Sequence, residues 1–416
     1  MPLSYSPPTL AYNERLTMLF EIERHEALTS TRWHADQAGE ALVAIVDDIE
    51  RRQQADHTWP THPRDDDEPK GLRHKSLYLG AAGVLWALHY LAREGAVTLR
   101  STPAESMNAV HTAYLASPDT GEVVPSYYLG EVGILLVAWR LTASRETADR
   151  LHACIEANID NPTHEALWAA PGTMVGAWHM LEWTGEPRWR ELFLRNVEQL
   201  WRTWLPDEET ACYLWTQDLY GRVYKMLGAG HGFAGNVYPL LRGAAVLEPA
   251  QRETLYERCA AMLVSTARIE GSDANWPPIV GMPGHDKMLV QWCHGSPGII
   301  TAFADFPTQR SLAVEALLVQ AGNLVWSAGP LTKGHGLCHG TAGNGYAFLK
   351  LYRRTGDTVW LDRARAFAMH ALLQRDAMCQ QHGQGRYTLW TGDAGLAVYL
   401  WHCLQGQADL PGLDLL

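Results

Sequence analysis

The sequence predicts an all-α protein in which seven helical hairpins close into an α/α toroid, with an inner and an outer ring of helices. An apolar or aromatic residue followed by G-x-x-G and an apolar helical run recurs seven times along the 416 residues. The stretches between these runs have the apolar spacing of surface helices. One such hairpin cannot bury its apolar face alone, so neighbouring copies are expected to stack around a shared core.

We call G-x-x-G the motif. Its first position marks the expected start of an inner helix. Successive motifs are 39 to 63 residues apart, which is close to the length of one helical hairpin. Glycines at these starts permit tight turns and close backbone approach. The turns are therefore expected to gather in a rim around a central cavity. The seven first residues are Gly80, Gly130, Ala169, Gly232, Gly295, Gly340 and Gly392, with alanine in place of glycine in the third repeat.

The two predicted rings differ in their apolar patterns. The runs VLWALHYL and ILLVAW are apolar on most sides, as in helices buried all round. The segments EPRWRELFLRNVEQLWRTW and VWLDRARAFAMHALLQR are amphipathic and predict outer helices. Residues 1–75 are expected to form N-terminal helices and a loop that lead into the toroid at 76–416, all in one domain. Proline-rich loops are expected near 54–75 and 275–287, and β structure should be minor.

Composition excludes several functional classes. The chain has 34 Lys and Arg against 46 Asp and Glu, a net charge of −12, with one acidic run at 65–68. The sequence has no block of basic residues, so nucleic acid is not an expected partner. No apolar run approaches the roughly 18 residues of a membrane span, and residues 1–16 lack the pattern of a secretory signal. Seven cysteines, an odd number, favour reduced thiols and a cytoplasmic location.

Two repeats carry a cysteine at the same position, two residues before the first glycine. One reads Trp-Cys293-His294-Gly and the other reads Leu-Cys338-His339-Gly. If these repeats are neighbours on the rim, the two thiols face each other. Two thiolates and an imidazole suit zinc, and three protein ligands leave the fourth position open, as in catalytic sites. Spacing alone allows either histidine to be the third ligand.

Three further residues are candidates for the same rim. His231 lies one residue before the fourth glycine and titrates in the range that suits a proton carrier, although it could simply cap a helix start. Glu165 lies four residues before Ala169 and either orients His231, positions a substrate amide, or belongs to an outer face. Lys333 is a cation close to Cys338 in sequence, where it would stabilise a thiolate.

Several motifs resemble those of the lanthionine synthetase C-like (LanC-like) family, and the resemblance covers essentially all seven repeats. They are NWPPIVG, LVQWCHGSPGII, KGHGLCHGTAGNGYAFLKLY, and WTQDLYG followed by LGAGHGFAGN. The resemblance implies a zinc ion held by Cys293, Cys338 and His339. It also implies a catalytic role for His231 and a glutathione-binding role for Lys333.

The resemblance also separates two branches of that family. Glu165 stands where nisin-type cyclases carry Asp, and His294 stands where they carry Tyr; both residues are typical of the LanC-like branch found widely in eukaryotes. Nisin-type cyclases have an Arg four residues before the first zinc cysteine, where this chain has Leu289, with Lys287 two residues earlier. A mechanism identical to the nisin type is therefore not expected.

The resulting expectation is a zinc-dependent Michael addition. A thiol, from cysteine or glutathione, would add to a dehydroalanine or dehydrobutyrine residue of a peptide or protein partner and leave a thioether. Two alternatives stay open: a non-catalytic module that binds zinc and glutathione, and an (α/α)-barrel carbohydrate-active enzyme using paired carboxylates such as Glu165 and Asp393. A glycosidase, however, has no use for two matched cysteines.

Overall fold

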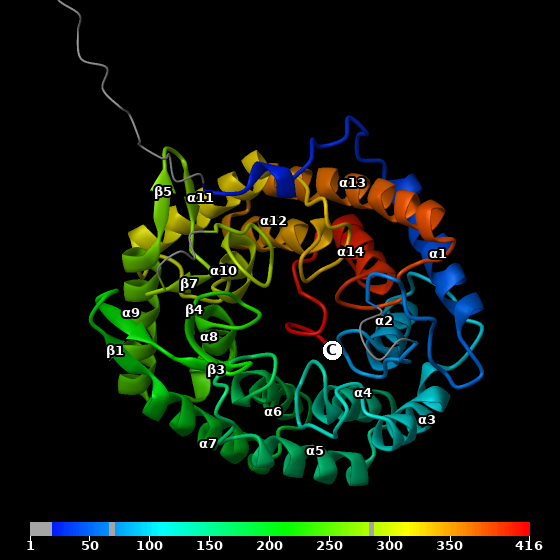
Figure 1. The fold of residues 1–416 in the computed structure, drawn as a ribbon, viewed down its shortest axis with the longest axis horizontal. Helices are drawn as coiled ribbons and strands as arrows, with labels where there is room; N and C mark the ends of the chain where they lie inside the picture. The colour runs from blue at the N-terminus through cyan, green and yellow to red at the C-terminus, as the bar shows by residue number, and fades with distance from the viewer. Residues whose placement is uncertain (1–18, 66–70, 283–286) are drawn as a thin grey trace, which may run out of the picture.

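Two concentric rings of helices make up the molecule (Figure 1). The computed structural model describes residues 19–65, 71–282 and 287–416. The expectations for residues 1–16 and for the acidic residues at 66–68 lie outside the described part of the chain. The all-α toroid predicted from the repeats is confirmed.

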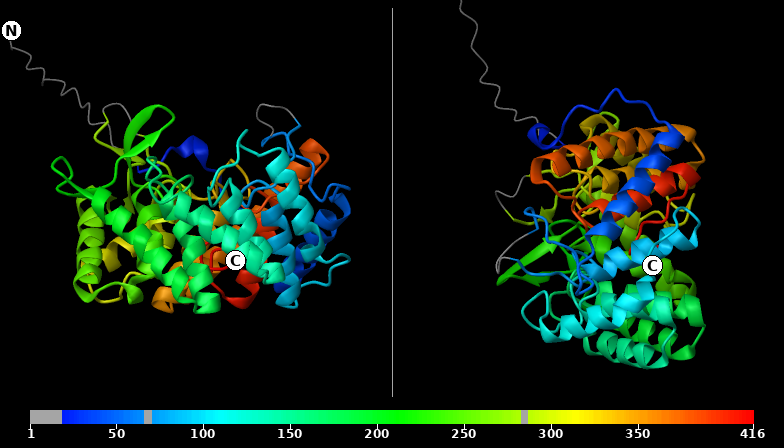
Figure 2. Two further views of the ribbon diagram at one scale, coloured as in Figure 1. Left: turned by 90° about the horizontal axis from the view of Figure 1, so that it is seen from below. Right: turned by 90° about the vertical axis from the view of Figure 1, so that its right-hand side faces the viewer.

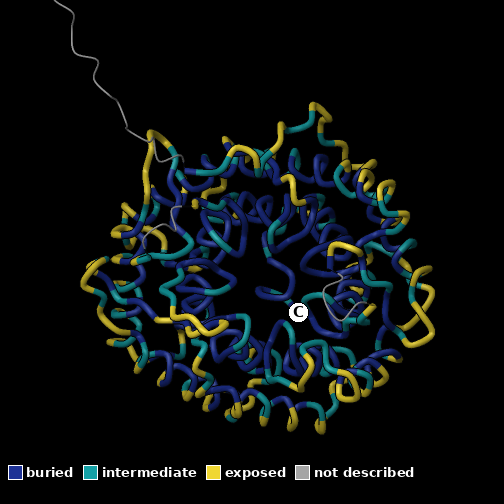
Figure 3. The backbone as a smooth tube through the Cα atoms, viewed as in Figure 1, coloured by how far each residue is buried: buried dark blue, intermediate teal, exposed yellow. Residues whose placement is uncertain are grey.

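The inner ring consists of the apolar helices that follow the seven motifs. In each case the helix is capped by the first residue of the motif, as the sequence predicts. Because these helices are buried on nearly every side, they appear dark along almost their whole length in Figure 3. The inner helices of the described chain are α2 (Ala81–Arg93), α4 (Glu131–Thr142), α6 (Ala170–Thr184), α8 (Phe233–Arg242), α10 (Ser296–Ala302), α12 (Thr341–Thr355) and α14 (Asp393–Gln405).

The outer ring consists of amphipathic helices, and each one after the first packs against the inner helix that precedes it. The helix α1 precedes the boundary expected at residue 75, yet it packs against α14 and closes the ring. The outer helices of the described chain are α1 (Ala35–Arg52), α3 (Pro103–Ala116), α5 (Arg145–Ala157), α7 (Pro187–Thr203), α9 (Pro249–Thr266), α11 (Leu312–Ala328) and α13 (Thr358–His382).

The same steric constraint requires glycine at the second glycine position of every motif. A Cβ atom at this position would lie 1.7 to 2.4 Å from the carbonyl oxygen of the residue six places earlier, in the turn that enters the helix. Any side chain would therefore push the turn off the helix start. The turn residues that carry the candidate site are held close to the inner helices in this way. The seven positions are Gly83, Gly133, Gly172, Gly235, Gly298, Gly343 and Gly395.

Short antiparallel strands project from the face of the toroid that carries the turns (Figure 2). They confirm that β structure is minor. Two short 3-10 helices, Ile22–Arg24 and Ala244–Val246, complete the described elements. The strands are β1 (Leu205–Asp207) paired with β2 (Cys212–Leu214); β3 (Gln217–Leu219), β4 (Arg222–Met226) and β7 (Ile279–Val280) in that order; and β5 (Arg268–Glu270) paired with β6 (Asp273–Asn275).

The last ten residues enter the centre of the ring (Figure 1). Asp414 in this segment is buried and forms an ion pair with the equally buried Lys350 of α12, at 2.7 Å between Nζ and Oδ2. The hydroxyl of Tyr238 donates to the same carboxylate at 3.0 Å, and the hydroxyl of Tyr127 donates to the carbonyl of Gly412 at 2.6 Å. The segment is thus tied to three inner helices or their turns. Among the described residues, no helix combines the length and apolar character needed to cross a membrane.

Candidate metal centre and active site

The repeat places chemically distinct side chains at equivalent positions along the rim. The residue just before the first motif residue is a histidine in three consecutive repeats: His231, His294 and His339. One residue earlier, the fifth and sixth repeats carry Cys293 and Cys338. Because the helices that follow these turns are neighbours in the inner ring, the histidines and cysteines form one continuous stretch of the rim.

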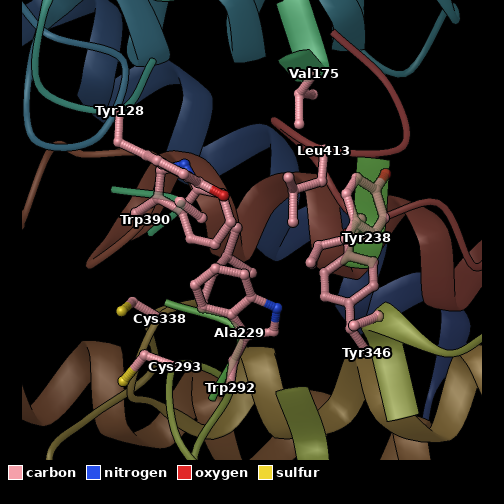
Figure 4. Packing of buried hydrophobic residues seen from close by; sticks show 14 of the residues in the cluster. Tyr128, Val175, Ala229, Tyr238, Trp292, Cys293, Cys338, Tyr346, Trp390 and Leu413 are labelled. Carbon is pink, nitrogen blue, oxygen red and sulfur yellow. The ribbon is translucent and has the colours of Figure 1, made fainter. Parts of the chain in front are cut away.

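Cys293, Cys338 and His339 come together at this rim. Their sulfur and ring nitrogen atoms all lie within 4.8 Å of one another, and both cysteines are buried. The amide of Cys293 donates to the carbonyl of Cys338 at 3.1 Å, and the amide of Cys338 donates to the carbonyl of Trp390 at 2.9 Å. The turns of the fifth, sixth and seventh repeats are therefore joined directly. Figure 4 shows the two sulfur atoms close together, with Trp390 above the cysteines and Trp292 to their right.

The two thiols form an electrostatically coupled pair. A hydrogen bond from Cys338 lowers the pKa of Cys293, and the same bond raises the pKa of Cys338. The side-chain amide of Gln291 also donates to the sulfur of Cys293, at 3.0 Å. Two cysteine sulfurs and an imidazole brought together in this way are a donor set that zinc prefers. These residues fit a zinc ion.

His339 and His294 have different surroundings. In the described chain, His339 belongs to the group with the two thiols, whereas His294 does not. The ring of His294 stacks on that of His231 instead, with centroids 5.8 Å apart and an interplanar angle of 22°. Burial lowers the pKa of His294. Of the two histidines that spacing left open, His339 is the one that lies with the two thiols.

Glu165 holds the imidazole of His231. Its carboxylate oxygen Oε2 lies 2.9 Å from Nδ1 of His231. The Glu165 side chain is 0% exposed, and its oxygens also accept from the amides of Leu167 at 2.9 Å and Trp168 at 2.6 Å. An outer-face position for Glu165 is thus wrong. Burial lowers the pKa of His231, but the hydrogen bond and the charge of Glu165 outweigh it, so that this pKa lies above its usual value.

A basic cavity of about 400 Å³ opens beside His339. Lys333 lines it together with Thr332 and two arginines that the sequence did not single out, Arg64 and Arg386. The guanidinium of Arg64 donates to the carbonyl of Lys333 at 2.7 Å. Both arginines come from segments far from Lys333 in sequence, and no motif marks them.

The segment that carries Arg64 is anchored by its neighbour Asp65. This carboxylate forms a buried ion pair with Arg386, with Nε and Oδ2 2.6 Å apart. Asp65 begins the acidic run, which the sequence suggested only as a charged loop. The structure gives this first acidic residue a specific partner 321 residues away.

In the described chain, three residues named in the alternative or in the departure from the nisin type do not belong to the group of Cys293, Cys338 and His339: Asp393, Leu289 and Lys287. Asp393 is buried and accepts from Nε2 of His335 at 2.7 Å. Glu165 and Asp393 are therefore each buried against a histidine, which is unfavourable for a pair of catalytic carboxylates. Leu289 is half-buried, and Lys287 is exposed.

Comparison with known families matches more than half of the chain. Residues 170–415 match the family described as lanthionine synthetase C-like protein. The chain belongs to the lanthionine synthetase C-like family. The match contains His231, Lys333 and the Cys293, Cys338 and His339 group, and it begins five residues after Glu165.

Two curated relatives come from eukaryotes, in agreement with the expected branch of the LanC-like family. The chain is 34% identical over 219 residues to glutathione S-transferase LANCL1 of Danio rerio, covering 51% of this chain and 50% of the relative. It is 38% identical over 199 residues to LanC-like protein GCL1 of Arabidopsis thaliana, covering 45% and 43%. This LanC-like chain thus matches about half the length of each relative.

The fold of this LanC-like chain is shared with a solved structure, nisin cyclase. The two superimpose with a TM-score of 0.58 at 14% sequence identity, covering 88% of this chain and 93% of the cyclase. At this identity the similarity concerns the fold. It confirms the toroid predicted from the seven repeats.

Proposed function

We propose that this protein joins a thiol to a dehydroalanine or dehydrobutyrine residue of a peptide or protein and thereby forms a thioether. The observation that carries the proposal is the pairing of His231 with Glu165 on the same stretch of rim as Cys293, Cys338 and His339. Those three residues would hold Zn²⁺. A bound zinc ion lowers the pKa of a thiol, so that the thiolate is available near neutral pH.

The reaction requires one bond to sulfur and one proton at carbon. The thiolate sulfur forms a bond to the β-carbon, the π pair of the Cα=Cβ bond moves toward the α-carbon and its carbonyl, and the α-carbon then takes up a proton. His231 supplies that proton. Since Nδ1 is bound to Glu165, Nε2 is the ring nitrogen that donates to substrate. The raised pKa of His231 keeps this nitrogen protonated at higher pH.

The basic cavity supplies a place for the thiol. Glutathione carries two carboxylates, and Lys333 and Arg64 bring two cations to one cavity beside His339. Arg386 also lines this cavity, with its guanidinium paired to Asp65. Guanidinium groups bind carboxylates through paired N–H donors, and the ammonium of Lys333 adds a point charge. None of the seven cysteines forms a disulfide bond, which fits a reducing compartment such as the cytoplasm.

The test is turnover with defined substrates. Zinc-loaded protein is incubated with glutathione and a short dehydroalanine peptide, and separately with a peptide that carries both cysteine and dehydroalanine. Mass spectrometry counts glutathione adducts in the first case. In the second, loss of free thiol by alkylation reports ring closure. We expect product formation well above a protein-free control.

Two variants sharpen this test. Lys333→Ala should raise the KM for glutathione about tenfold, as expected for a lost charge-assisted contact. Lys287→Ala is the matched control, because this lysine is exposed and does not line the cavity. Zinc and glutathione binding without turnover on either substrate would contradict catalysis and favour the non-catalytic binding module.

A further inference from the structure

We propose that Trp168 and Tyr220 form the binding site for the peptide that carries the electrophilic residue. The proposal rests on the function proposed above and adds the class of its second substrate. Trp168 occupies, in the third repeat, the rim position that His231 occupies in the fourth. The helices that follow these two turns, α6 and α8, are in contact. Trp168 is therefore the neighbour of His231 on the side away from His339.

Trp168 is also tied to the proton-donating pair. Its backbone amide donates to Oε1 of Glu165 at 2.6 Å, on the same carboxylate whose other oxygen holds His231. Its indole Nε1 donates to the hydroxyl of Tyr220 at 3.3 Å. The first contact holds the backbone of Trp168 beside the Glu165–His231 pair, and the second brings the hydroxyl of Tyr220 to the indole of Trp168.

Tyr220 lies at the turn between β3 and β4. It is 79% exposed. Its backbone has φ of +53°, followed by Gly221 at +75°, a hairpin turn that favours Asn-Gly and is unfavourable for tyrosine. Val223 on the same hairpin is 61% exposed. A solvent-exposed aromatic side chain in a strained turn, aimed at a second aromatic beside a proposed active site, is best explained by a ligand that covers it.

The two sides of the centre differ in chemistry. Toward the sixth and seventh repeats, next to His339, the cavity is lined by cations and suits a thiol with carboxylates. Toward the third repeat, Trp168 and Tyr220 offer aromatic faces. Aromatic faces bind apolar and aromatic side chains and impose no charge requirement. The occupant is therefore a peptide with an apolar or aromatic residue next to its dehydroamino acid, which enters from the side opposite the thiol.

Binding of unreactive peptides tests this site without turnover. A fluorescein-labelled peptide has alanine in place of dehydroalanine and phenylalanine beside it, and a second peptide has serine in place of the phenylalanine. Anisotropy titrations compare the unmodified protein with Trp168→Ala and Tyr220→Asn. Asparagine tolerates the left-handed turn, so the hairpin is preserved while the ring is lost. Tyr220→Phe keeps the ring, and Val264→Ala on the exposed face of α9 is the matched control.

We expect Trp168→Ala and Tyr220→Asn to weaken binding of the phenylalanine peptide by about five- to tenfold and to leave glutathione binding unchanged. Tyr220→Phe and Val264→Ala should bind as the unmodified protein does. The serine peptide should bind the unmodified protein more weakly than the phenylalanine peptide does, and removal of either ring should change its affinity little. Unchanged affinity in both ring-removing variants overturns the proposal, and so does an equal loss of glutathione binding. Ring-dependent peptide binding in a protein that shows no turnover would support this site while contradicting the proposed reaction.

Discussion

Nδ1 of His231 lies 2.9 Å from a carboxylate oxygen of Glu165, although 66 residues separate them in the chain. The carboxylate is itself fixed by two backbone amides and is fully buried. The imidazole is therefore held in one orientation, with 24% of its side chain exposed on the rim. A residue placed in this way acts at a defined atom, and the effects of changing it are correspondingly specific.

Replacing His231 by Asn should slow thiol addition by on the order of 10²-fold or more, the usual worth of a positioned general acid. Zinc content should not change, because His231 lies outside the Cys293, Cys338 and His339 group. The rate is measured with a dehydroalanine peptide and glutathione, and zinc is measured by elemental analysis. An unchanged rate would mean that another group delivers the proton, and lost zinc would mean that the ligand set is wrong.

The dependence of the reaction rate on pH should change when Glu165 is replaced. A proton donor works in its protonated form, so the rate should hold to pH values above about 6.5, the ordinary histidine pKa, and then fall as the pH rises through the elevated pKa of His231. Glu165→Gln removes the negative charge that raises this pKa. The falling limb should then move to lower pH, which kcat measured across pH reports. If the falling limb of the pH profile does not move, His231 is not the proton donor.

We expect one zinc ion per chain, bound by Cys293, Cys338 and His339. Alanine at any of the three should reduce zinc in the purified protein to a small fraction of one equivalent. His294→Ala is the control, since this neighbouring histidine stacks on His231 and is not part of the group. Elemental analysis under non-chelating conditions distinguishes the outcomes. A zinc-free unmodified protein would contradict the metal centre altogether.

The fold should survive removal of the metal. The proposed ligands lie in turns that enter inner helices, whereas the two rings are held together by a core that runs around the whole toroid. Small zinc modules differ, because in them the metal supplies most of the folding free energy. After chelation, far-ultraviolet circular dichroism should keep most of its helical signal. A collapse of that signal would show a structural zinc and weaken the catalytic interpretation.

Replacing only one partner of the Lys350–Asp414 ion pair should destabilise the protein strongly. Lys350→Met leaves an unpaired buried carboxylate and should lower the free energy of unfolding by about 3–5 kcal/mol, whereas Lys350→Met combined with Asp414→Leu should recover most of the loss. Denaturant titration measures both. A double variant as unstable as the single one would mean that the segment depends on the charges themselves.

The same pair predicts a sign for acid unfolding. Burial raises the pKa of Asp414, but the charge and hydrogen bond of Lys350, the charge of Arg242 and the backbone amide of Leu410 together outweigh burial, so the folded-state pKa lies below the usual value. The stability that it contributes is present above the unfolded pKa of about 3.9 and is lost as the pH falls through the folded pKa. Lys350→Met should therefore flatten the acid limb of the unfolding curve. If the acid limb does not change, other carboxylates cause the loss of stability at low pH.

The repeat glycines explain how much of this could be predicted from sequence. Helix starts are local, because each G-x-x-G turn fixes its own geometry, so all seven inner starts were predicted correctly, Ala169 included. The same periodicity put Cys293, Cys338 and His231 on one rim. It did not identify Arg64 or Arg386, since these residues reach the cavity through contacts between distant segments that no local pattern records.

The join between α1 and α14 has a consequence for synthesis. About 340 residues separate these helices, so at roughly 5 to 20 residues per second α1 leaves the ribosome about 20 to 70 seconds before its partner exists. During that interval the apolar face formed by Leu42, Ile45, Val46 and Ile49 has no native surface to cover it. We therefore expect this apolar face to stay exposed until α14 has been made, and a stalled or shortened translation product would leave the ring open.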